Sequence, residues 1–442
     1  MKLNLSEIIR ATNAEIIFEN KNVINKNINV FDFSTDTRTI KNGDIYIPIK
    51  GKNFDGESFI QNACNLGAIG YFTTDKNNIV NKADIVFFVH DTQEAYLQLA
   101  NFYKRKFNPY TIAVTGSSGK TTVKEMMYSV LKNAGETVKS ELNHNNEIGL
   151  CQTLSAIEKT TKYLVVEMGM RGQGEIEILS KYAEPDIGVI VNIGSAHIGR
   201  LGSLLNIAKA KFEITKYIKN NGVLISHENE LIKQINDNKH KTIFFNLKDV
   251  KINEMTEFHS IFNYKGNEYK LNIAGEHNIQ NALAVIEAGI FMGLTPEIIA
   301  KGLAEFSPIE KRWEIQTIKG FNIINDCYNS NPDSVKAALK TFLDLTKAGK
   351  TVILGDMGEL GLNEENYHIQ IGNYLEQFNC DYVLTFGNLA KYIQPKNIKT
   401  IHFETKNELV EYIKKNLPKG ENILLKASRY MKFEEIIEEL KK

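Results

Sequence analysis

A glycine-rich turn followed by a lysine and two threonines carries the clearest chemistry in this sequence. It reads Thr115-Gly-Ser-Ser-Gly-Lys-Thr-Thr122 and follows a β-branched stretch at 111–115. Gly116 and Gly119 let backbone N–H groups face a polyphosphate, and a helix beginning near Lys120 adds its positive end. Lys120 is expected to reach the outer phosphates and Thr121 or Thr122 to ligate Mg²⁺. The pattern predicts an ATP site made of Thr115, Gly116, Ser117, Ser118, Gly119, Lys120, Thr121 and Thr122.

The glycine spacing departs from the longer form of this phosphate-loop pattern. That form has glycine five positions before the second glycine of the turn, where this chain has Val114. The stretch matches the shorter Thr-Gly-x-x-Gly-Lys-Thr-Thr form instead. A glycine turn with an accidental lysine is the alternative, which the strand-like residues before the turn and the helix-like residues after it disfavour.

Alternating strands and helices determine the expected architecture. With 442 residues and about 150 residues per domain, the chain should form three domains. Short apolar stretches at 163–167, 187–192 and 222–226 alternate with helical patterns, which predicts a parallel sheet covered on both faces. A similar alternation beyond Arg312 predicts a second doubly wound sheet. The expected class is α/β, with a smaller α/β domain at 1–106, a central domain at 107–308 and a C-terminal domain at 309–442.

Two polar residues lie where parallel sheets gather ligands, at or just past the carboxyl ends of strands. Glu167 ends one predicted strand, and His197 closes the stretch Val191-Asn-Ile-Gly-Ser-Ala-His197. Beside a phosphate loop, a carboxylate and an imidazole are candidate ligands for the Mg²⁺ that accompanies ATP, although Mg²⁺ prefers oxygen. A capping role for Glu167 and a plain loop position for His197 are the alternatives.

Two further pairs of polar residues occur in helical stretches. Asn278 and Asn281 are three apart, so their amides share a helix face and could read the edge of adenine. Asn278 could instead be only a helix N-cap. Lys209 and Lys211 are two apart and point to different sides of their helix, so at most one faces the site.

Polar residues also cluster near both ends of the chain. Ser34, Asp36 and Arg38 alternate along a stretch interpreted as extended, where they either converge on a ligand or form a structural Asp–Arg pair. In the C-terminal part, polar loops at 326–333, 355–361 and 426–429 each follow a predicted strand. Three such loops at one sheet edge describe a binding surface.

Composition argues against several functional classes. The 53 basic and 53 acidic residues balance, which disfavours a surface for nucleic acid or anionic membranes. The first ten residues have charges on both sides of a very short apolar stretch and do not read as a secretory signal, and no stretch of eighteen apolar residues occurs. The four scattered cysteines suit reduced thiols in a cytoplasmic protein.

Along essentially its whole length, the sequence resembles the Mur ligase family. The resemblance is carried by Thr115-Gly-Ser-Ser-Gly-Lys-Thr-Thr122, Asn145-Asn-Glu-Ile-Gly149, Glu167-Met-Gly169, residues 192–197, Gly275-Glu-His-Asn-Ile-Gln-Asn281, Arg312 and Asp326. Ser34-Thr-Asp-Thr-Arg38 and Lys50-Gly51 resemble the family's uridine-nucleotide site. Residues 328–334 and 355–361 are similar to those of the member that adds a final dipeptide.

This resemblance implies an ATP-dependent peptide ligase of peptidoglycan precursor synthesis. UDP-N-acetylmuramoyl-tripeptide and D-alanyl-D-alanine would be joined through an acyl phosphate, giving the pentapeptide, ADP and phosphate. Asn281 would face adenine, Asp326 the ribose and Arg312 the phosphates. Candidate contacts to the dipeptide are Tyr328, Asn329 and Asn331, and those to the UDP-sugar peptide are Ser34, Asp36, Arg38, Lys50, Asn145 and Asn146.

The resemblance also implies a catalytic set of Lys120, Glu167, His197 and Lys211, with two Mg²⁺ ions. The metal ligands would be Thr121, Glu167, His197 and Lys211, the last as a carbamate. Electrostatics gives the modification a purpose, because two unit charges ~4 Å apart interact by roughly 4 kcal/mol at an effective dielectric near 20. An ammonium would repel the doubly charged Mg²⁺ by more than this amount, and a carbamate reverses the sign.

Three residues depart from the family pattern, namely Glu57, Cys327 and Ala427, and they affect expected substrate contacts rather than phosphoryl transfer. Three alternative functions remain open: folylpolyglutamate synthesis, addition of a single amino acid to the UDP-sugar, and nucleotide binding without catalysis. A monomer that neither binds nucleic acid nor inserts into a membrane is expected. The sequence does not distinguish lysine from diaminopimelate in the tripeptide.

Overall fold

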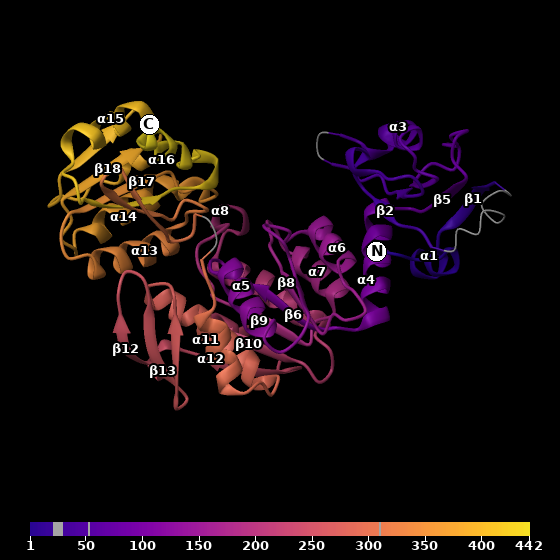
Figure 1. Ribbon diagram of the computed structural model, residues 1–442, viewed down its shortest axis with the longest axis horizontal. Helices are drawn as coiled ribbons and strands as arrows, with labels where there is room; N and C mark the ends of the chain where they lie inside the picture. Colours follow the sequence, from indigo (N-terminus) through magenta and orange to yellow (C-terminus); the bar gives the residue numbers. More distant parts are fainter. Residues whose placement is uncertain (21–29, 52–53, 309–310) are drawn as a thin grey trace. The chain divides into compact units, whose positions relative to one another are not determined.

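The computed structural model describes residues 1–20, 30–51, 54–308 and 311–442, in two compact units (Figure 1). The first unit comprises Met1–Thr111, Glu136–Val166 and Ile178–Glu184, and the second Ile112–Gly135, Glu167–Glu177 and Pro185–Lys442. Helices alternate with strands of four sheets in this described part, so the predicted α/β class is confirmed. The division at 106/107 and 308/309 stays a prediction, and residues 309 and 310 lie outside the described residues.

A mixed five-stranded sheet lies in the first unit, in the order β1-β5-β4-β3-β2. β1 is antiparallel to β5, and the other neighbours are parallel. The strands are β1 (Glu15–Glu19), β2 (Phe33–Ser34), β3 (Ile45–Tyr46), β4 (Gly70–Thr73) and β5 (Ile85–Phe88). The helices are α1 (Leu5–Thr12), α3 (Ile60–Asn65), α4 (Thr92–Phe107) and α6 (Glu147–Ser155). Tyr46, Tyr71 and Val86 belong to its buried core.

Ser34, Asp36 and Arg38 do not lie on one extended face, so this prediction is wrong. β2 ends at Ser34, and the 3-10 helix Thr37–Thr39 begins directly after Asp36. Asp36 Oδ1 accepts a hydrogen bond from Arg38 N (2.9 Å), the contact by which a short acidic side chain starts a helical turn. The chain therefore turns where the alternation of polar residues predicts a strand.

The phosphate loop leaves a six-stranded sheet in the order β11-β10-β9-β6-β8-β7. Its strands are β6 (Tyr110–Thr115), β7 (Thr137–Lys139), β8 (Tyr163–Glu167), β9 (Ile187–Ile190), β10 (Val223–His227) and β11 (Lys241–Phe245). The pairings of β6 with β9, β9 with β10 and β10 with β11 are parallel. All of β9 is buried, as expected when both faces of a sheet are covered. The predicted parallel sheet is confirmed, although β7 and β11 were not predicted.

Several helices and a small antiparallel sheet accompany these strands. The helices are α5 (Lys120–Leu131), α7 (Glu175–Ala183), α8 (Ile198–Leu201), α9 (Leu204–Phe212), α10 (Glu230–Ile235), α11 (Glu276–Phe291) and α12 (Pro296–Ala304). The sheet contains β12 (Lys251–Met255), β13 (Ser260–Tyr264) and β14 (Asn267–Leu271). The hydroxyl of Tyr264 donates to buried Glu287 and ties this sheet to α11.

The C-terminal sheet has the order β15-β16-β20-β17-β18-β19. Its strands are β15 (Glu314–Ile318), β16 (Phe321–Asn325), β17 (Lys350–Gly355), β18 (Tyr382–Phe386), β19 (Thr400–Phe403) and β20 (Asn422–Lys426). Its helices are α13 (Pro332–Leu345), α14 (Glu364–Leu375), α15 (Lys406–Asn416) and α16 (Glu434–Lys441). β15 is antiparallel to β16, and the other pairs are parallel. The doubly wound prediction is confirmed, with β15, β19 and α15 added. None of the helices in the described ranges is long and apolar enough to cross a membrane.

Gly302 lets α12 lie close against α5, the helix that follows the phosphate loop. A Cβ at Gly302 would lie 2.3 Å from Val130 Cα and 2.8 Å from Ser129 O. Gly302→Ala should lower the free energy of unfolding by about 1 to 2 kcal/mol, because overpacking outweighs the ~1 kcal/mol that alanine gains over glycine in a helix. Urea unfolding measures this change. The control Lys301→Ala, exposed on the same helix, should shift it by less than about 0.5 kcal/mol, and equal shifts would contradict the prediction.

Candidate active site

The phosphate loop turns sharply between β6 and α5, and two glycines make the turn possible. Gly119 has a φ of +78° and precedes the first residue of α5. A Cβ at Gly119 would lie 2.5 Å from Asn281 Oδ1, and one at Gly116 would lie 2.9 Å from Val191 Cβ. α5 begins at Lys120 as predicted, so the positive end of this helix lies at the loop.

Asn192, two residues past β9, holds the loop in shape. Its Oδ1 accepts hydrogen bonds from the backbone N–H groups of Ser117 (3.1 Å) and Ser118 (3.0 Å), and its Nδ2 donates to Ser118 O (3.1 Å). These backbone N–H groups are of the kind that bind phosphate in such loops. No separate role was predicted for Asn192, because an asparagine after a strand has no specific signal.

Asn192→Asp should weaken ADP binding at least tenfold. The carboxylate can still accept hydrogen bonds from the loop N–H groups. Its negative charge, however, repels a phosphate charge ~4 Å away by about 4 kcal/mol at an effective dielectric of 20. Solvent and Mg²⁺ screen part of this repulsion. Calorimetric titration with ADP measures the change. The control Asn65→Asp makes the same charge change at an exposed site in the first unit and should leave the affinity unchanged. Equal affinities of the Asn192→Asp protein and the unaltered protein for ADP would contradict the prediction.

Lys120 extends its amine over the loop. Its Nζ donates a hydrogen bond to Gly116 O (2.9 Å). Burial lowers the pKa of Lys120, while the charge of Glu167 opposes this shift and that of Arg312 adds to it. Lys120 is therefore within electrostatic range of both groups, which places three of the predicted site residues together.

Arg312 connects α5 with the residues that follow β16. Its Nη2 donates to Thr121 Oγ1 (3.0 Å), and its guanidinium carbon lies 3.9 Å from the centre of the Tyr328 ring. Lys311 and Trp313, on either side, have positive φ angles of 63° and 55°. The backbone thus takes an uncommon conformation where it presents Arg312 to the phosphate-loop helix.

Glu167, His197 and Lys211 come from three separate elements. Glu167 ends β8 and is buried, His197 precedes α8 with a φ of +65°, and Lys211 lies in α9. Burial lowers the pKa of His197, Glu359 opposes this shift, and Lys120 and Lys211 add to it. His197 therefore lies within electrostatic range of both lysines. In the described ranges, no group of three or more His, Cys, Asp and Glu side chains is placed to hold a metal.

Lys211 is the inward-facing lysine of α9. It is 1% exposed, whereas Lys209 is exposed to solvent, as expected for residues two apart on a helix. Burial lowers the pKa of Lys211 well below its ordinary value, and the charge of Lys120 lowers it further. A buried amine in these surroundings favours its neutral, nucleophilic form.

Asn278 and Asn281 lie beside each other on α11, both buried. Asn281 Nδ2 donates to Asn278 Oδ1 (3.4 Å), and Asn278 Nδ2 donates to Ala274 O (2.7 Å). The alternative that Asn278 is the N-cap is wrong, because α11 begins at Glu276 and Gly275 takes the cap position. Since Asn281 also borders Gly119, this amide pair lies next to the phosphate loop.

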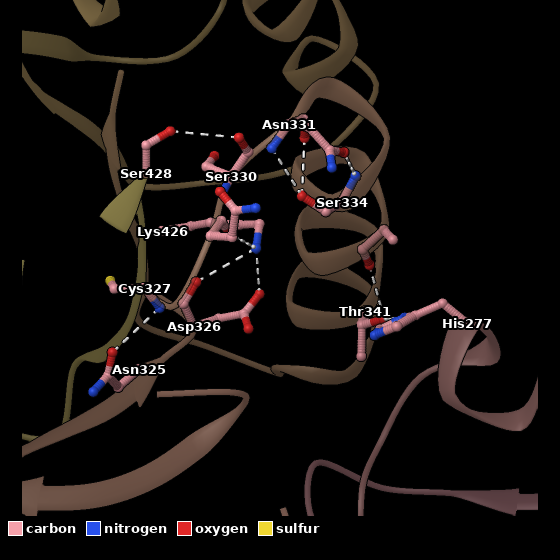
Figure 2. Close-up of polar contacts among 12 residues, drawn as sticks. His277, Asn325, Asp326, Cys327, Ser330, Asn331, Ser334, Thr341, Lys426 and Ser428 are labelled. Carbon is pink, nitrogen blue, oxygen red and sulfur yellow. Dashed lines mark hydrogen bonds and ion pairs between the residues drawn. The ribbon is translucent and has the colours of Figure 1, made fainter. Parts of the chain in front are cut away.

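His277 lines a cavity of about 190 Å³, together with residues of α11 and α13. Its Nε2 is 3.1 Å from Asn278 Nδ2. Its Nδ1 is 3.5 Å from Thr341 Oγ1 (Figure 2). Burial lowers the pKa of His277 to about 4, so the ring is neutral near pH 7. The Asn278 amide then donates to Nε2. His277 was not predicted as a site residue.

A polar cluster follows β16 (Figure 2). Lys426, buried at the end of β20, donates through Nζ to Asp326 Oδ2 (2.6 Å) and Asn329 O (3.2 Å). Asn331 caps α13, because its Oδ1 accepts from Ser334 N (2.9 Å). The structure thus brings Asp326, Asn329 and Asn331 onto one loop, with Tyr328 beneath Arg312. Lys426, which anchors this loop, was not predicted as a site residue.

The predicted UDP-sugar contacts lie in the first unit. Arg38 donates to Asp36 through Nε (2.9 Å) and Nη2 (2.6 Å), and Ser34 Oγ donates to Asp36 O (3.0 Å). Hydrogen bonds from Arg38 lower the pKa of Asp36 to about 2. These contacts are the Asp–Arg pair of the alternative interpretation, and Arg38 remains largely exposed.

Lys50, Asn145 and Asn146 lie elsewhere in the first unit. Lys50 is exposed, with its Nζ 4.0 Å from Asp55 Oδ2. Asn146, the residue after Asn145, is the N-cap of α6, and its Oδ1 accepts a hydrogen bond from Gly149 N (3.0 Å). The side-chain oxygen of Asn146 therefore has a structural role in capping α6, and this role does not involve the side-chain nitrogen.

The three residues that depart from the family pattern each have defined surroundings in the structure. Glu57 accepts from Thr74 N (2.7 Å) and closes the end of β4. Cys327 and Ala427 are buried in the C-terminal core. A Cβ at Gly355 would lie 2.7 Å from that of Ala427, so this part of the core is already tightly packed.

Three protein-family models match successive parts of the chain. The model described as "Mur ligase family, catalytic domain" matches residues 33–104. "Mur ligase middle domain" matches residues 114–289, and "Mur ligase, glutamate ligase domain" matches residues 311–429.

Relatives match along nearly the whole chain. The UDP-N-acetylmuramoyl-tripeptide--D-alanyl-D-alanine ligase of Bacillus subtilis is 39% identical over 99% of this chain and 97% of its own length. The crystal structure of MurF from Acinetobacter baumannii has a TM-score of 0.91 at 28% identity, covering 100% of this chain and 99% of that one. MurF from Thermotoga maritima, in complex with ADP, has a TM-score of 0.84 at 28% identity, covering 93% and 97%. The chain belongs to the Mur ligase family, and within it to the group of these UDP-N-acetylmuramoyl-tripeptide--D-alanyl-D-alanine ligases.

Proposed function

We propose that this protein is an ATP-dependent ligase that joins D-alanyl-D-alanine to UDP-N-acetylmuramoyl-tripeptide. The products are UDP-N-acetylmuramoyl-pentapeptide, ADP and phosphate, in peptidoglycan precursor synthesis. The observation that carries the proposal is the full-length match to the Bacillus subtilis ligase of that name. The phosphate loop with Lys120 and Arg312 supports it, because the reaction has to bring a carboxylate and a polyphosphate together despite their like charges.

In the proposed reaction, an oxygen of the tripeptide's terminal carboxylate attacks the γ-phosphorus of ATP, and ADP leaves. The amine of D-alanyl-D-alanine then attacks the carbonyl carbon of the acyl phosphate, loses a proton, and phosphate leaves. Lys120, Arg312 and the loop N–H groups stabilise charge that moves from the carboxylate to the bridging oxygen of ADP. Positioning and charge neutralisation therefore account for most of the catalysis.

The nucleotide is proposed to lie along α5 and α11. Residues 115–122 and Arg312 bind the phosphates. The amides of Asn278 and Asn281 bind the edge of adenine, and Asp326 binds the ribose. The amide pair borders Gly119, which supports a nucleotide that extends from the loop toward α11. The neutral His277 ring lines the cavity on that side.

Two Mg²⁺ ions are proposed to be held by Thr121, Glu167, His197 and Lys211 as a carbamate. Burial and the charge of Lys120 lower the pKa of Lys211 well below its usual range, and this favours the neutral amine that carbamate formation needs. Attack of the neutral amine on CO₂ with loss of a proton would replace this amine with a carboxylate-like ligand. Bound Mg²⁺ would neutralise charge on the phosphates and the attacking carboxylate.

The other substrates are assigned by location. Ser34, Asp36, Arg38, Lys50, Asn145 and Asn146 of the first unit are proposed to bind the UDP-sugar peptide. Exposed Arg38, already oriented by Asp36, supports this assignment. Tyr328, Asn329 and Asn331 are proposed to contact D-alanyl-D-alanine. We place the enzyme in the cytoplasm as a monomer, with three domains at 1–106, 107–308 and 309–442.

Product analysis tests this function. Purified protein is incubated with ATP, Mg²⁺, UDP-N-acetylmuramoyl-tripeptide and D-alanyl-D-alanine, and the masses of the nucleotide products are measured by mass spectrometry. Formation of the pentapeptide only when the dipeptide is present is the expected result. A product formed with single amino acids instead, or glutamate addition to a folate, would overturn the proposal in favour of the corresponding alternative.

A further inference from the structure

Two segments meet beside His197. One follows β9 and includes the short helix α8 (191–202, the β9 loop), and the other follows β17 (356–361, the β17 loop). Gly199 N donates a hydrogen bond to Glu359 O (3.3 Å). A Cβ at Gly199 would lie 2.4 Å from Gly361 N, and one at Gly361 would lie 2.6 Å from Gly199 Cα. A side chain at either position would separate the loops, so the pair of glycines permits this backbone contact.

The contact brings a carboxylate to the predicted metal ligand. Glu359 Oε2 lies 2.6 Å from His197 Nδ1, and Glu359 Oε1 lies 3.5 Å from Arg200 Nη2. The geometry at Nδ1 does not meet the requirements of a hydrogen bond, so the close approach of the carboxylate oxygen to Nδ1 carries this step. The only carboxylate paired with His197 in the described part thus comes from the β17 loop.

The β17 loop is held in place from within the C-terminal sheet. Met357 N donates to His368 Nε2 (2.9 Å), and Gly358 N donates to Ser428 Oγ (2.9 Å). His368 Nδ1 is 2.7 Å from Glu364 O, so its proton lies on Nδ1 and Nε2 is free to accept. These bonds fix the two residues directly before Glu359.

His197 and Glu359 share an uncommon backbone conformation. Their φ angles are +65° and +62°, in the left-handed region that non-glycine residues rarely adopt. Such conformations persist where the surroundings hold them and are concentrated at functional sites. Here the strained residues are the two whose side chains meet.

We propose that Glu359 is a positioning residue for His197. A carboxylate at Nδ1 favours the tautomer that is protonated there, which leaves the lone pair of Nε2 for a divalent cation. This inference rests on the proposed function, since that function requires Mg²⁺ at His197. It adds that His197 is correctly oriented only while the β17 loop touches the β9 loop, which couples the C-terminal sheet to phosphoryl transfer.

The ring tautomer and cation binding test the proposal without turnover. Nitrogen-15 NMR of the metal-free protein, with His197 assigned by loss of its signals in His197→Gln, should place the proton on Nδ1. Glu359→Ala should abolish that preference, and Mn²⁺ binding in the presence of ADP, followed by electron paramagnetic resonance, should weaken about 10- to 100-fold. Glu359→Gln retains an acceptor oxygen and should restore the tautomer and most of the affinity.

Two controls separate positioning from general effects of charge or folding. Arg200→Ala removes the second partner of the same carboxylate, and Glu365→Ala removes an exposed carboxylate that accepts from the Tyr392 hydroxyl. Both should leave the tautomer and the Mn²⁺ affinity unchanged. Unchanged tautomer or affinity in a folded Glu359→Ala protein would overturn the proposal. Should the unaltered protein fail to form the pentapeptide while these shifts occur, the proposed function fails and the positioning role stands.

Discussion

Lys120→Met should lower kcat by about a thousandfold while leaving the fold at least as stable. Methionine has a similar length but no charge, so the γ-phosphate loses a cation, and removal of one such group costs about 10² to 10³ in kcat. Burial lowers the pKa of Lys120, which means that the fold disfavours its charged form. An apolar replacement removes this penalty, so activity and stability should change in opposite directions.

Dipeptide-dependent phosphate release and urea unfolding measure the two effects of Lys120→Met. Lys209→Met, an exposed lysine on α9, is the matched control and should change neither quantity appreciably. A Lys120→Met protein that keeps more than about a tenth of the activity would remove this lysine from the catalytic set. A protein that loses activity only because it unfolds would contradict the stability part of the prediction.

Lys211→Ala should lower kcat by about 10²- to 10³-fold, and short carboxylic acids should restore part of it. The unaltered protein, supplied with ¹³C-labelled bicarbonate, should show a carbamate resonance that the alanine variant lacks. The physical reason is the burial of Lys211 within range of the Lys120 charge, which lowers the pKa of Lys211 and favours the neutral amine that reacts with CO₂. In the alanine variant, a small carboxylate can occupy the vacated space and supply the missing negative charge.

Lys211→Arg is the matched control, because it retains a positive charge but its guanidinium does not form a carbamate. It should be as inactive as the alanine variant and should not respond to added carboxylates. An active arginine variant would show that a cation is needed at this position. An absent carbamate resonance in fully active protein would likewise refute the modification.

The phosphate loop and the strands around it are the parts that sequence alone predicts best. Gly119 and Lys120 mark the junction of β6 and α5 because few residues fit a left-handed turn followed by a helix start. Glu167 was predicted at a strand end and closes β8. Local chemistry determined these positions, so a local pattern was sufficient to find them.

Contacts between distant segments could not be predicted in the same way. Asn192 accepts hydrogen bonds from Ser117 and Ser118, which precede it in the sequence by 75 and 74 positions. Glu359 contacts His197 across more than 150 positions. Asparagine and glutamate are common in loops, so their types alone give no sign of these partners. β12 was missed because its residues are nearly all exposed and lack an alternating apolar pattern.

The extended face predicted for residues 34–38 was wrong because the alternation of polar residues does not reveal a local hydrogen bond. Alternating polar residues fit a strand edge, but Asp36 also favours a helical turn by accepting from a backbone N–H two positions later. The local hydrogen bond determines the conformation here. For Asn331 and Asn146, the capping oxygen is likewise a structural role that the sequence pattern did not separate from substrate binding.

Isotope transfer tests whether ATP activates the tripeptide carboxylate as an acyl phosphate. UDP-N-acetylmuramoyl-tripeptide labelled with ¹⁸O in its terminal carboxylate is incubated with ATP, Mg²⁺ and D-alanyl-D-alanine, and the released phosphate is analysed by mass. We expect one ¹⁸O atom in each phosphate from a fully labelled carboxylate, with release that depends on the dipeptide. Unlabelled phosphate, or release indifferent to the dipeptide, would contradict this expectation.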